Sequence, residues 1–222
     1  MEQLDEDIWT VARPFVMGGA DIGTRMTILR IGGDLLLHSP VRIDDALAER
    51  IERLGRPRWL VAPCAYHHLF LAGAKERWPE ARVLAPPGVR DKQPSLAVDG
   101  TLPENVPSEW ASSVEVRFIE GIPKLQEVAL LHRPSKTLLL ADFLFNIPHL
   151  ESWLGRTFLT LAGAYGGPKQ TRMFRMLMKD REAVRASRDA ILAWDFDRVS
   201  VCHRDIVERG GKDVFAQATR WI

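Results

Sequence analysis

The stretch WLVAPCAYHHL at residues 59–69 constrains the fold of this 222-residue chain more than any other segment. Its first residues are apolar and predict a strand, and its last residues begin a segment with helical spacing. The histidine pair His67 and His68 falls between the two, on the predicted loop. A strand that passes through a loop into a helix is a common unit of α/β architecture, so this segment favours an α/β protein.

Similar strands and helices alternate along the rest of the chain. The apolar pattern predicts strands at residues 8–11, 24–31, 35–38, 58–62, 82–85, 114–119, 127–132, 137–141 and 199–202. Helical spacing predicts helices at residues 44–54, 69–78 and 211–221, and largely helical structure over residues 170–194. Residues 94–107 contain three prolines and predict a long surface loop. Strand clusters interrupted by helices indicate sheets whose outer faces are covered by helices.

Composition narrows the function classes. Apolar residues make up 46% of the chain and charged residues 27%, which is typical of a soluble globular protein, and the length suits one domain over residues 1–222. The net charge of +1 argues against nucleic acid and anionic membranes as partners. The start MEQLDEDIW lacks the features of a signal peptide, and no apolar run approaches the roughly 20 residues of a transmembrane helix. We expect a cytoplasmic protein with a small-molecule substrate, and a homo-oligomer is compatible with the sequence.

The loop at residues 63–68 resembles the H-x-H-x-D-H loop of the metallo-β-lactamase-fold hydrolases. Pro63 and Ala65 stand at the first two histidines of that loop, His67 stands at its aspartate, and His68 stands at its last histidine. The resemblance implies an α/β fold of four layers, an αββα sandwich of metallo-β-lactamase type, with a metal site along one edge.

Three later landmarks follow in the order of that family. Gly121-Ile122 falls where the family has a glycine-histidine turn, and Asp142 in the stretch ADFLF matches the aspartate of a strand ending in G-D-x-L-F. His203 matches the last family histidine, at the end of another strand. The HHLF and DFLFN stretches also resemble an uncharacterised branch of this superfamily, catalogued as a domain of unknown function.

The resemblance implies that one of two metal sites is lost. The first-site ligands would stand at Pro63, Ala65 and Ile122, and none of these residues can bind a metal. The second-site ligands would stand at four positions that all hold candidate ligands, namely His67, His68, Asp142 and His203. We therefore expect one divalent ion of zinc, iron or manganese, if the protein binds metal at all.

Imidazoles and a carboxylate are suitable ligands for these ions. Asp142 would be both a ligand and the catalytic residue that orients the attacking water. Four protein ligands fill a tetrahedral zinc ion, so catalysis needs either a further coordination position or one of the four residues not bound. His67 is the residue least expected to bind, because imidazole is longer than the carboxylate it replaces.

Several neighbouring residues have secondary roles in this interpretation. Asn146, His149 and Cys202 are predicted to lie behind the ligands or to face the substrate. Cys64 is read as a small buried residue, and both cysteines are expected to be unpaired.

The leading interpretation is a metal-dependent hydrolase with a single ion. A catalytically silent binding or scaffold protein on the same fold is the first alternative, and a mononuclear iron redox protein is the second.

Overall fold

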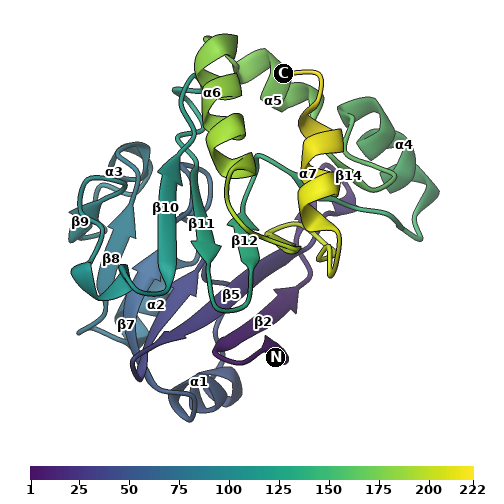
Figure 1. Ribbon diagram of the computed structural model, residues 1–222. Coiled ribbons are helices and arrows are strands. Elements are labelled where there is room, and N and C mark those ends of the chain that lie inside the picture. Colours follow the sequence, from purple (N-terminus) through teal and green to yellow (C-terminus); the bar gives the residue numbers. More distant parts are fainter.

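Two β-sheets pack face to face in the computed structural model, which describes residues 1–222 (Figure 1). The larger sheet has the order β1-β2-β5-β6-β7-β8-β9, and the smaller sheet has the order β10-β11-β12-β15. The strands of the larger sheet are β1 (Glu2–Asp5), β2 (Ile8–Arg13), β5 (Thr24–Ile31), β6 (Asp34–His38), β7 (Arg56–Val61), β8 (Arg82–Ala85) and β9 (Gly100–Thr101). Those of the smaller sheet are β10 (Val114–Phe118), β11 (Val128–His132), β12 (Thr137–Leu140) and β15 (Arg198–Val201).

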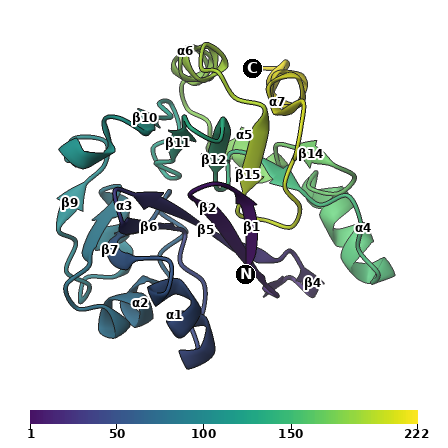
Figure 2. The ribbon, with the colours of Figure 1, turned by 60° about the horizontal axis from the view of Figure 1, so that its bottom comes forward.

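Helices cover the outer face of each sheet, so the four-layer arrangement predicted from the sequence is confirmed. Figure 2 shows two helices against the larger sheet, α1 (Asp45–Glu52) and α2 (Leu71–Arg77), and places α6 (Arg181–Leu192) and α7 (Gly211–Thr219) on the opposite side of the molecule. Shorter elements complete the chain: α3 (Gly88–Lys92), a 3-10 helix at Ser108–Trp110, α5 (Arg172–Leu177), and the pairs β3 (Val16–Met17) with β4 (Ala20–Asp21) and β13 (Phe145–Asn146) with β14 (Pro168–Lys169). None of the helices combines the length and the apolar character needed to cross a bilayer.

Three apolar layers follow from the alternation of side chains along the strands. In β6, Leu36 belongs to the cluster between the sheets, whereas Leu35 and Leu37 belong to the cluster beneath α1 and α2. In β11, Leu130 likewise faces the larger sheet, and Leu131 joins the cluster around α6 and α7. The two sheets therefore share one central core, and each has a second core against its own helices.

The topology brings the ends of four strands to one edge of the sandwich. β6 and β7 are parallel neighbours with His38 opposite Val61, and β12 and β15 are parallel neighbours with Leu140 opposite Val201. Parallel neighbours deliver the residues that follow them to the same edge. A hydrogen bond of 2.9 Å between the Thr27 and Ser200 hydroxyls joins β5 to β15 across the sheets.

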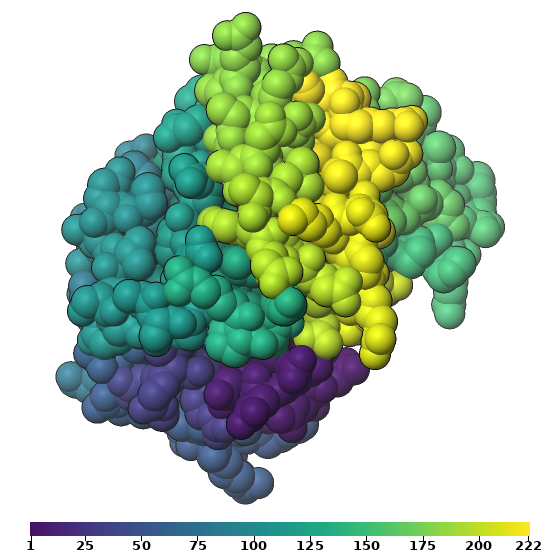
Figure 3. Space-filling model, in the orientation of Figure 1, coloured from purple at the N-terminus to yellow at the C-terminus, as the bar shows by residue number.

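The element α4 (Trp153–Ala162) is absent from the sequence-based assignment. Ser152 caps this helix by accepting a hydrogen bond from the Gly155 amide at 3.1 Å, and Gly163 ends it at φ +74°. Most of its apolar side chains face solvent, and the residues of α4 that are buried are Gly155 and Leu159. Figure 3 shows α4 standing out on the right-hand side of the molecule.

His132 gives the fold a measurable dependence on pH. Its side chain is fully buried at the end of β11, with Nδ1 2.7 Å from the Ser135 hydroxyl, and burial lowers the pKa of His132 to about 4. The unfolded chain, with a histidine pKa of about 6.5, binds a proton in this range that the folded protein excludes. The free energy of unfolding should therefore fall as the pH drops from about 6.5 to about 4.

We expect the H132Q variant to lose part of this dependence. Urea denaturation at pH 7.5 and pH 5 should show a smaller stability difference in the variant than in the wild type, by up to about 2 kcal/mol. If the stability difference between pH 7.5 and pH 5 is the same in H132Q and the wild type, His132 is not the group that titrates.

Candidate metal centre

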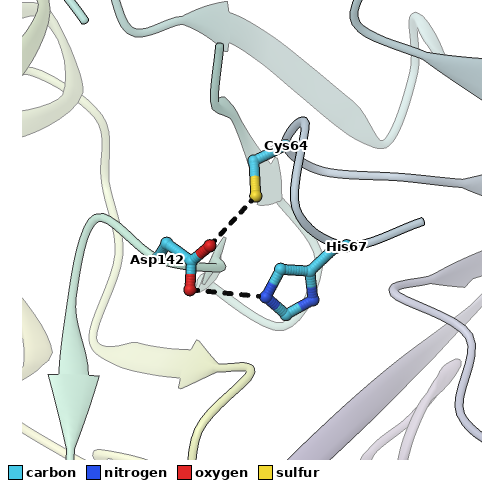
Figure 4. Close-up of side chains that lie close together, drawn as sticks. All are labelled: Cys64, His67 and Asp142. Atoms are coloured by element: carbon cyan, nitrogen blue, oxygen red, sulfur yellow. Dashed lines mark hydrogen bonds and ion pairs between the residues drawn. The ribbon is translucent and has the colours of Figure 1, made fainter. Parts of the chain in front are cut away.

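Three side chains at the strand-end edge place potential metal ligands close together. The Cys64 sulfur, a His67 ring nitrogen and an Asp142 carboxylate oxygen all lie within 4.8 Å of one another (Figure 4). Cys64 and His67 come from the loop after β7, and Asp142 follows β12. Cys64 Sγ lies 3.3 Å from Asp142 Oδ2, and His67 Nε2 lies 3.5 Å from Asp142 Oδ1. Thiolate, imidazole and carboxylate are all ligands that zinc accepts.

His203 reaches this cluster through the same carboxylate. Its Nδ1 lies 2.9 Å from the carbonyl oxygen of Gly23, and because a carbonyl only accepts, Nδ1 carries the proton of that hydrogen bond. Its Nε2 then faces Asp142 Oδ1 at 3.2 Å. An ionised carboxylate also only accepts, so the space between these atoms calls for a second proton on His203 or for a shared cation. A histidine whose second nitrogen donates to a backbone carbonyl is held as metal-binding histidines usually are.

The backbone supports this orientation of His203. Gly23 adopts φ +65°, and a Cβ at this position would lie 3.3 Å from the backbone nitrogen of Arg204. Arg204 is itself left-handed at φ 64°, and its carbonyl accepts a hydrogen bond of 3.2 Å from the guanidinium of Arg25. Phe145 stacks on the His203 ring with 4.5 Å between centroids. The His203 side chain therefore has little freedom to turn.

Glu127 fixes the position of Asp142 from behind. Its fully buried carboxyl group accepts hydrogen bonds from the backbone amides of Ala141, Asp142 and Phe143 at 2.8, 2.9 and 2.7 Å. Burial and the nearby Asp142 charge raise the pKa of Glu127 to about 8. For Asp142, burial acts to raise the pKa, but His67 and His203 outweigh it and hold the pKa below its usual value. Asp142 is thus the carboxylate that is ionised at neutral pH.

Ser39 holds His67 from the opposite side. The Ser39 hydroxyl lies 2.7 Å from His67 Nδ1, which leaves Nε2 directed at Asp142. Ser39 follows β6 in a left-handed conformation at φ 56°, a conformation that costs energy for a residue with a side chain. The bend at the end of β6 therefore places the hydroxyl against the histidine.

The other predicted site residues lie in different positions. His68 lies outside the three-residue cluster, and its Nδ1 accepts a hydrogen bond of 3.0 Å from the side-chain amide of Gln93. Burial, Lys92 and His67 lower the pKa of His68. Its assignment as a ligand stays a prediction, as does that of His203.

Asn146, Cys202 and His149 occupy three different environments. Asn146 is buried and donates to the backbone carbonyl of Asp205 at 2.9 Å, so it holds the loop that carries His203. Cys202 is buried, and its burial raises the pKa of the thiol. His149 lines a separate surface groove with Asp21 and Arg204. Both cysteines are free thiols in the structure.

A cavity of about 370 Å³ opens onto the cluster. Its polar lining consists of Thr24, Ser39, His67, His68, Asp142 and His203, and most of its other lining residues are hydrophobic. The site is thus an enclosed polar group of side chains at the base of an apolar cavity.

A family model matches residues 5–153 of the chain, which is more than half of its length. The chain belongs to the family of the domain of unknown function DUF4336. The match includes Cys64, His67, His68 and Asp142, and ends before His203. A comparison with curated proteins found no match.

Solved structures similar to this DUF4336 protein are metallo-β-lactamases, so the chain has the metallo-β-lactamase fold. One is DIM-1 exposed to ceftazidime, with a TM-score of 0.63 and 14% identity over 99% of this chain and 95% of that chain. Another, from Pontibacter korlensis, has a TM-score of 0.63 and 12% identity over 95% of each chain. A third, FIM-1 from Pseudomonas aeruginosa in its mono-zinc form, has a TM-score of 0.62 and 14% identity over 99% of this chain and 94% of that chain. Identities this low show the fold and leave the activity open.

In this DUF4336 protein, apolar packing occupies the positions of the lost first-site ligands. Pro63, Ala65 and Ile122 are buried, and Ile122 belongs to the core beneath α6 and α7. Gly88 approaches Ala65 so closely that a Cβ on this glycine would lie 3.1 Å from the alanine Cβ. The first-site positions thus contribute side chains to the core and offer no donor atoms.

Sequence reasoning did not anticipate how three residues contact this DUF4336 site. Cys64 was expected to be a small buried residue, and it is fully buried in the core beneath α6 and α7, but its thiol also contacts Asp142. Ser39 and Glu127 gave no local signal, because each contacts its histidine or aspartate partner only after the strands assemble.

Proposed function

We propose that this protein is a metal-dependent hydrolase that uses a single divalent ion. The ion would be held by Cys64, His67 and Asp142, with His203 as a fourth ligand, and hydrolysis would then require a fifth coordination position for water. The observation that carries the proposal is the convergence of these side chains, in which Cys64, His67 and His203 all approach the one Asp142 carboxylate. The fold is also that of FIM-1, which has been solved in a mono-zinc form.

The donor set suits a divalent metal ion. A thiolate and a carboxylate together balance the charge of a divalent cation, and the mixture of sulfur, nitrogen and oxygen suits zinc. Two of the donors are also oriented in advance, since Ser39 holds His67 and Gly23 holds His203. Such an ion supplies Lewis-acid polarisation of a carbonyl oxygen and activation of water.

The residues of the chain have separate tasks in this proposal. Asp142 is the only carboxylate that lines the cavity, and we assign it the role of orienting the attacking water by accepting a hydrogen bond from it. Glu127 fixes Asp142 through the backbone of residues 141–143. The apolar cavity wall limits the access of bulk water, which strengthens the electrostatic interactions inside the site. His68 remains a further candidate ligand because it lines the same cavity.

Metal titration of matched variants tests this ligand set. We expect the wild type to bind one zinc ion per chain, and Cys64→Ala to weaken that binding at least about tenfold because a charged ligand is lost. Cys202→Ala is the matched control, since Cys202 is also buried near the site but lies outside the cluster. His68→Ala should retain one equivalent of zinc.

The opposite pattern would support the ligand set expected from the family resemblance: His68→Ala would lose the metal and Cys64→Ala would keep it. A wild-type protein that binds no metal as purified or after reconstitution would favour the silent scaffold. Tightly bound iron with no hydrolytic activity would favour the redox protein.

A further inference from the structure

The wall of the site cavity is largely apolar away from the polar cluster. Eight of its fifteen lining residues are hydrophobic, including Ile22 and Phe145, which are buried beside the polar cluster. Met17, Leu69 and Met173 form exposed parts of the lining, with 47%, 54% and 44% of their surface accessible. Methionine side chains are flexible and adapt to ligands of irregular shape. The apolar wall therefore continues out to solvent, where a ligand enters.

Most of the polar lining residues lie close to Asp142, whereas His68 turns to Gln93. Ser39 contacts His67, His67 and His203 both approach Asp142, and Thr24 follows the glycine whose carbonyl holds His203. The cavity therefore has a polar base and an apolar remainder. A ligand that fills it needs a polar group at one end and an apolar body.

Charge narrows the ligand further. None of the lining residues is lysine or arginine, and Asp142 is the only acid among them. The Lys92 ammonium lies 4.5 Å above the ring of the lining residue Tyr66 but is not itself part of the lining. A phosphate or carboxylate would lose its hydration in this cavity with no lysine or arginine to compensate, and a protonated His203 is already paired with Asp142. A divalent ion would leave little charge for such an anion, since Cys64 and Asp142 already balance it.

We infer that the cavity takes a neutral acyl compound, an uncharged ester or amide with an apolar acyl chain. The volume of about 370 Å³ lies near the lower end of the range for small-molecule sites, which suits a single chain of medium length. The carbonyl group lies at the polar base and the chain lies along the wall. This orientation rests on the proposed function, whereas the preference for a neutral apolar ligand rests on the wall alone.

The corresponding reaction is hydrolysis of the acyl bond. The carbonyl carbon gains the hydroxyl of water, its bond to the alcohol or amine breaks, and the leaving group takes the remaining proton. The acid product is a carboxylate at neutral pH, and the cavity has no lysine or arginine to retain it. A wall without lysine or arginine thus favours the binding of a neutral substrate and the release of a negatively charged product.

Displacement of a neutral fluorescent dye measures this preference without relying on activity. N-phenyl-1-naphthylamine is bound to the protein and displaced by butanamide, hexanamide, octanamide or octanoate at pH 8. We expect affinity to rise about fourfold for each added methylene until the cavity is full. Octanoate should bind at least about tenfold more weakly than octanamide, although the two chains have the same length.

Two substitutions on α5 provide a matched pair. Met173 lines the cavity, and Met176 lies on the same short helix, is 73% exposed and is not part of the lining. Met173→Lys should weaken octanamide binding and strengthen octanoate binding, whereas Met176→Lys should change neither. Both positions are exposed enough to accept lysine, and equal melting temperatures would verify that both variants fold.

The outcomes of the displacement experiment test the ligand class and the proposed hydrolase function separately. The neutral acyl ligand is rejected if the dye does not bind, if chain length has no effect, or if octanoate binds wild type as tightly as octanamide. The series is repeated after treatment with a chelator, because the wall does not depend on metal. If affinity depends on chain length but the protein binds no metal, the proposed hydrolase function is rejected and the neutral acyl ligand is retained. If the protein binds one metal ion but affinity does not depend on chain length, the neutral acyl ligand alone is rejected.

Discussion

Replacement of Asp142 by asparagine is expected to abolish tight metal binding. The Asp142 carboxylate lies between His67 and His203 and next to Cys64, so it is the anion at the centre of the cluster. Asparagine keeps the size and one oxygen but removes the charge that balances the cation. With metal at about a hundred times its dissociation constant, binding to the folded state adds about 2.7 kcal/mol of stability, or roughly 5–10 °C in melting temperature for a chain of this size. Differential scanning calorimetry with and without a strong chelator measures this difference.

Asp205→Asn is the matched control for this prediction. Asp205 is exposed, follows His203 by two residues and contributes only its backbone to the Asn146 hydrogen bond. Its asparagine variant should bind metal and respond to chelator as the wild type does. If the melting temperature of the wild type does not respond to chelator and Asp142→Asn melts at the same temperature, Asp142 only accepts hydrogen bonds and the scaffold interpretation is favoured.

Much of the fold could be predicted because the strands carry local signals. The predicted strands at residues 24–31 and 82–85 match β5 and β8, and the glycine pair after β5 turns the chain at φ 59° and φ 96° into β6. The helical region at residues 170–194 divides into α5 and α6, because Asp180 caps a new helix by accepting from the Ala183 amide at 3.0 Å. Within the loop at residues 94–107, β9 pairs with β8, a long-range contact that the sequence of the loop does not encode.

The candidate site was predictable in place but only partly in composition. The strand ends after β7, β12 and β15 marked where Asp142 and the histidines would meet. On an irregular loop, however, spacing does not determine which side chains turn inward. Cys64 faces Asp142, whereas His68 turns to Gln93 on the chain segment after α3. The resemblance indicated a histidine pair; in the structure Cys64 and His67 lie beside Asp142, and His68 as a ligand stays a prediction.

Glu127 illustrates the part of the site that only tertiary structure defines. It precedes β11 in the sequence, and nothing in its neighbourhood marks it as functional. The antiparallel pairing of β11 with β12 brings its carboxyl group beneath the turn that carries Asp142. A buried acid at this position is unfavourable unless its oxygens are paired, and the three backbone amides of residues 141–143 supply that pairing.

Replacement of Glu127 by leucine should destabilise the protein severely. Leucine fills a similar volume but leaves three buried amides without acceptors, and each unpaired amide costs about 1–3 kcal/mol. We expect the free energy of unfolding to fall by at least about 3 kcal/mol in urea denaturation. A loss below about 1 kcal/mol would mean that the turn does not depend on Glu127.

Glu127→Gln separates the stability of the turn from the positioning of Asp142. One amide oxygen of glutamine can still accept from Asp142 and Phe143, but its NH₂ group would face the Ala141 amide, donor against donor. The variant should therefore fold with a smaller loss in the free energy of unfolding, about 1–2 kcal/mol. It should bind zinc about 10- to 100-fold more weakly, because the Asp142 carboxylate is no longer held in place. Unchanged zinc affinity in the folded glutamine variant would assign Glu127 to the stability of the turn alone. Weakened affinity would show that the metal centre extends behind its ligands into the β11–β12 pair.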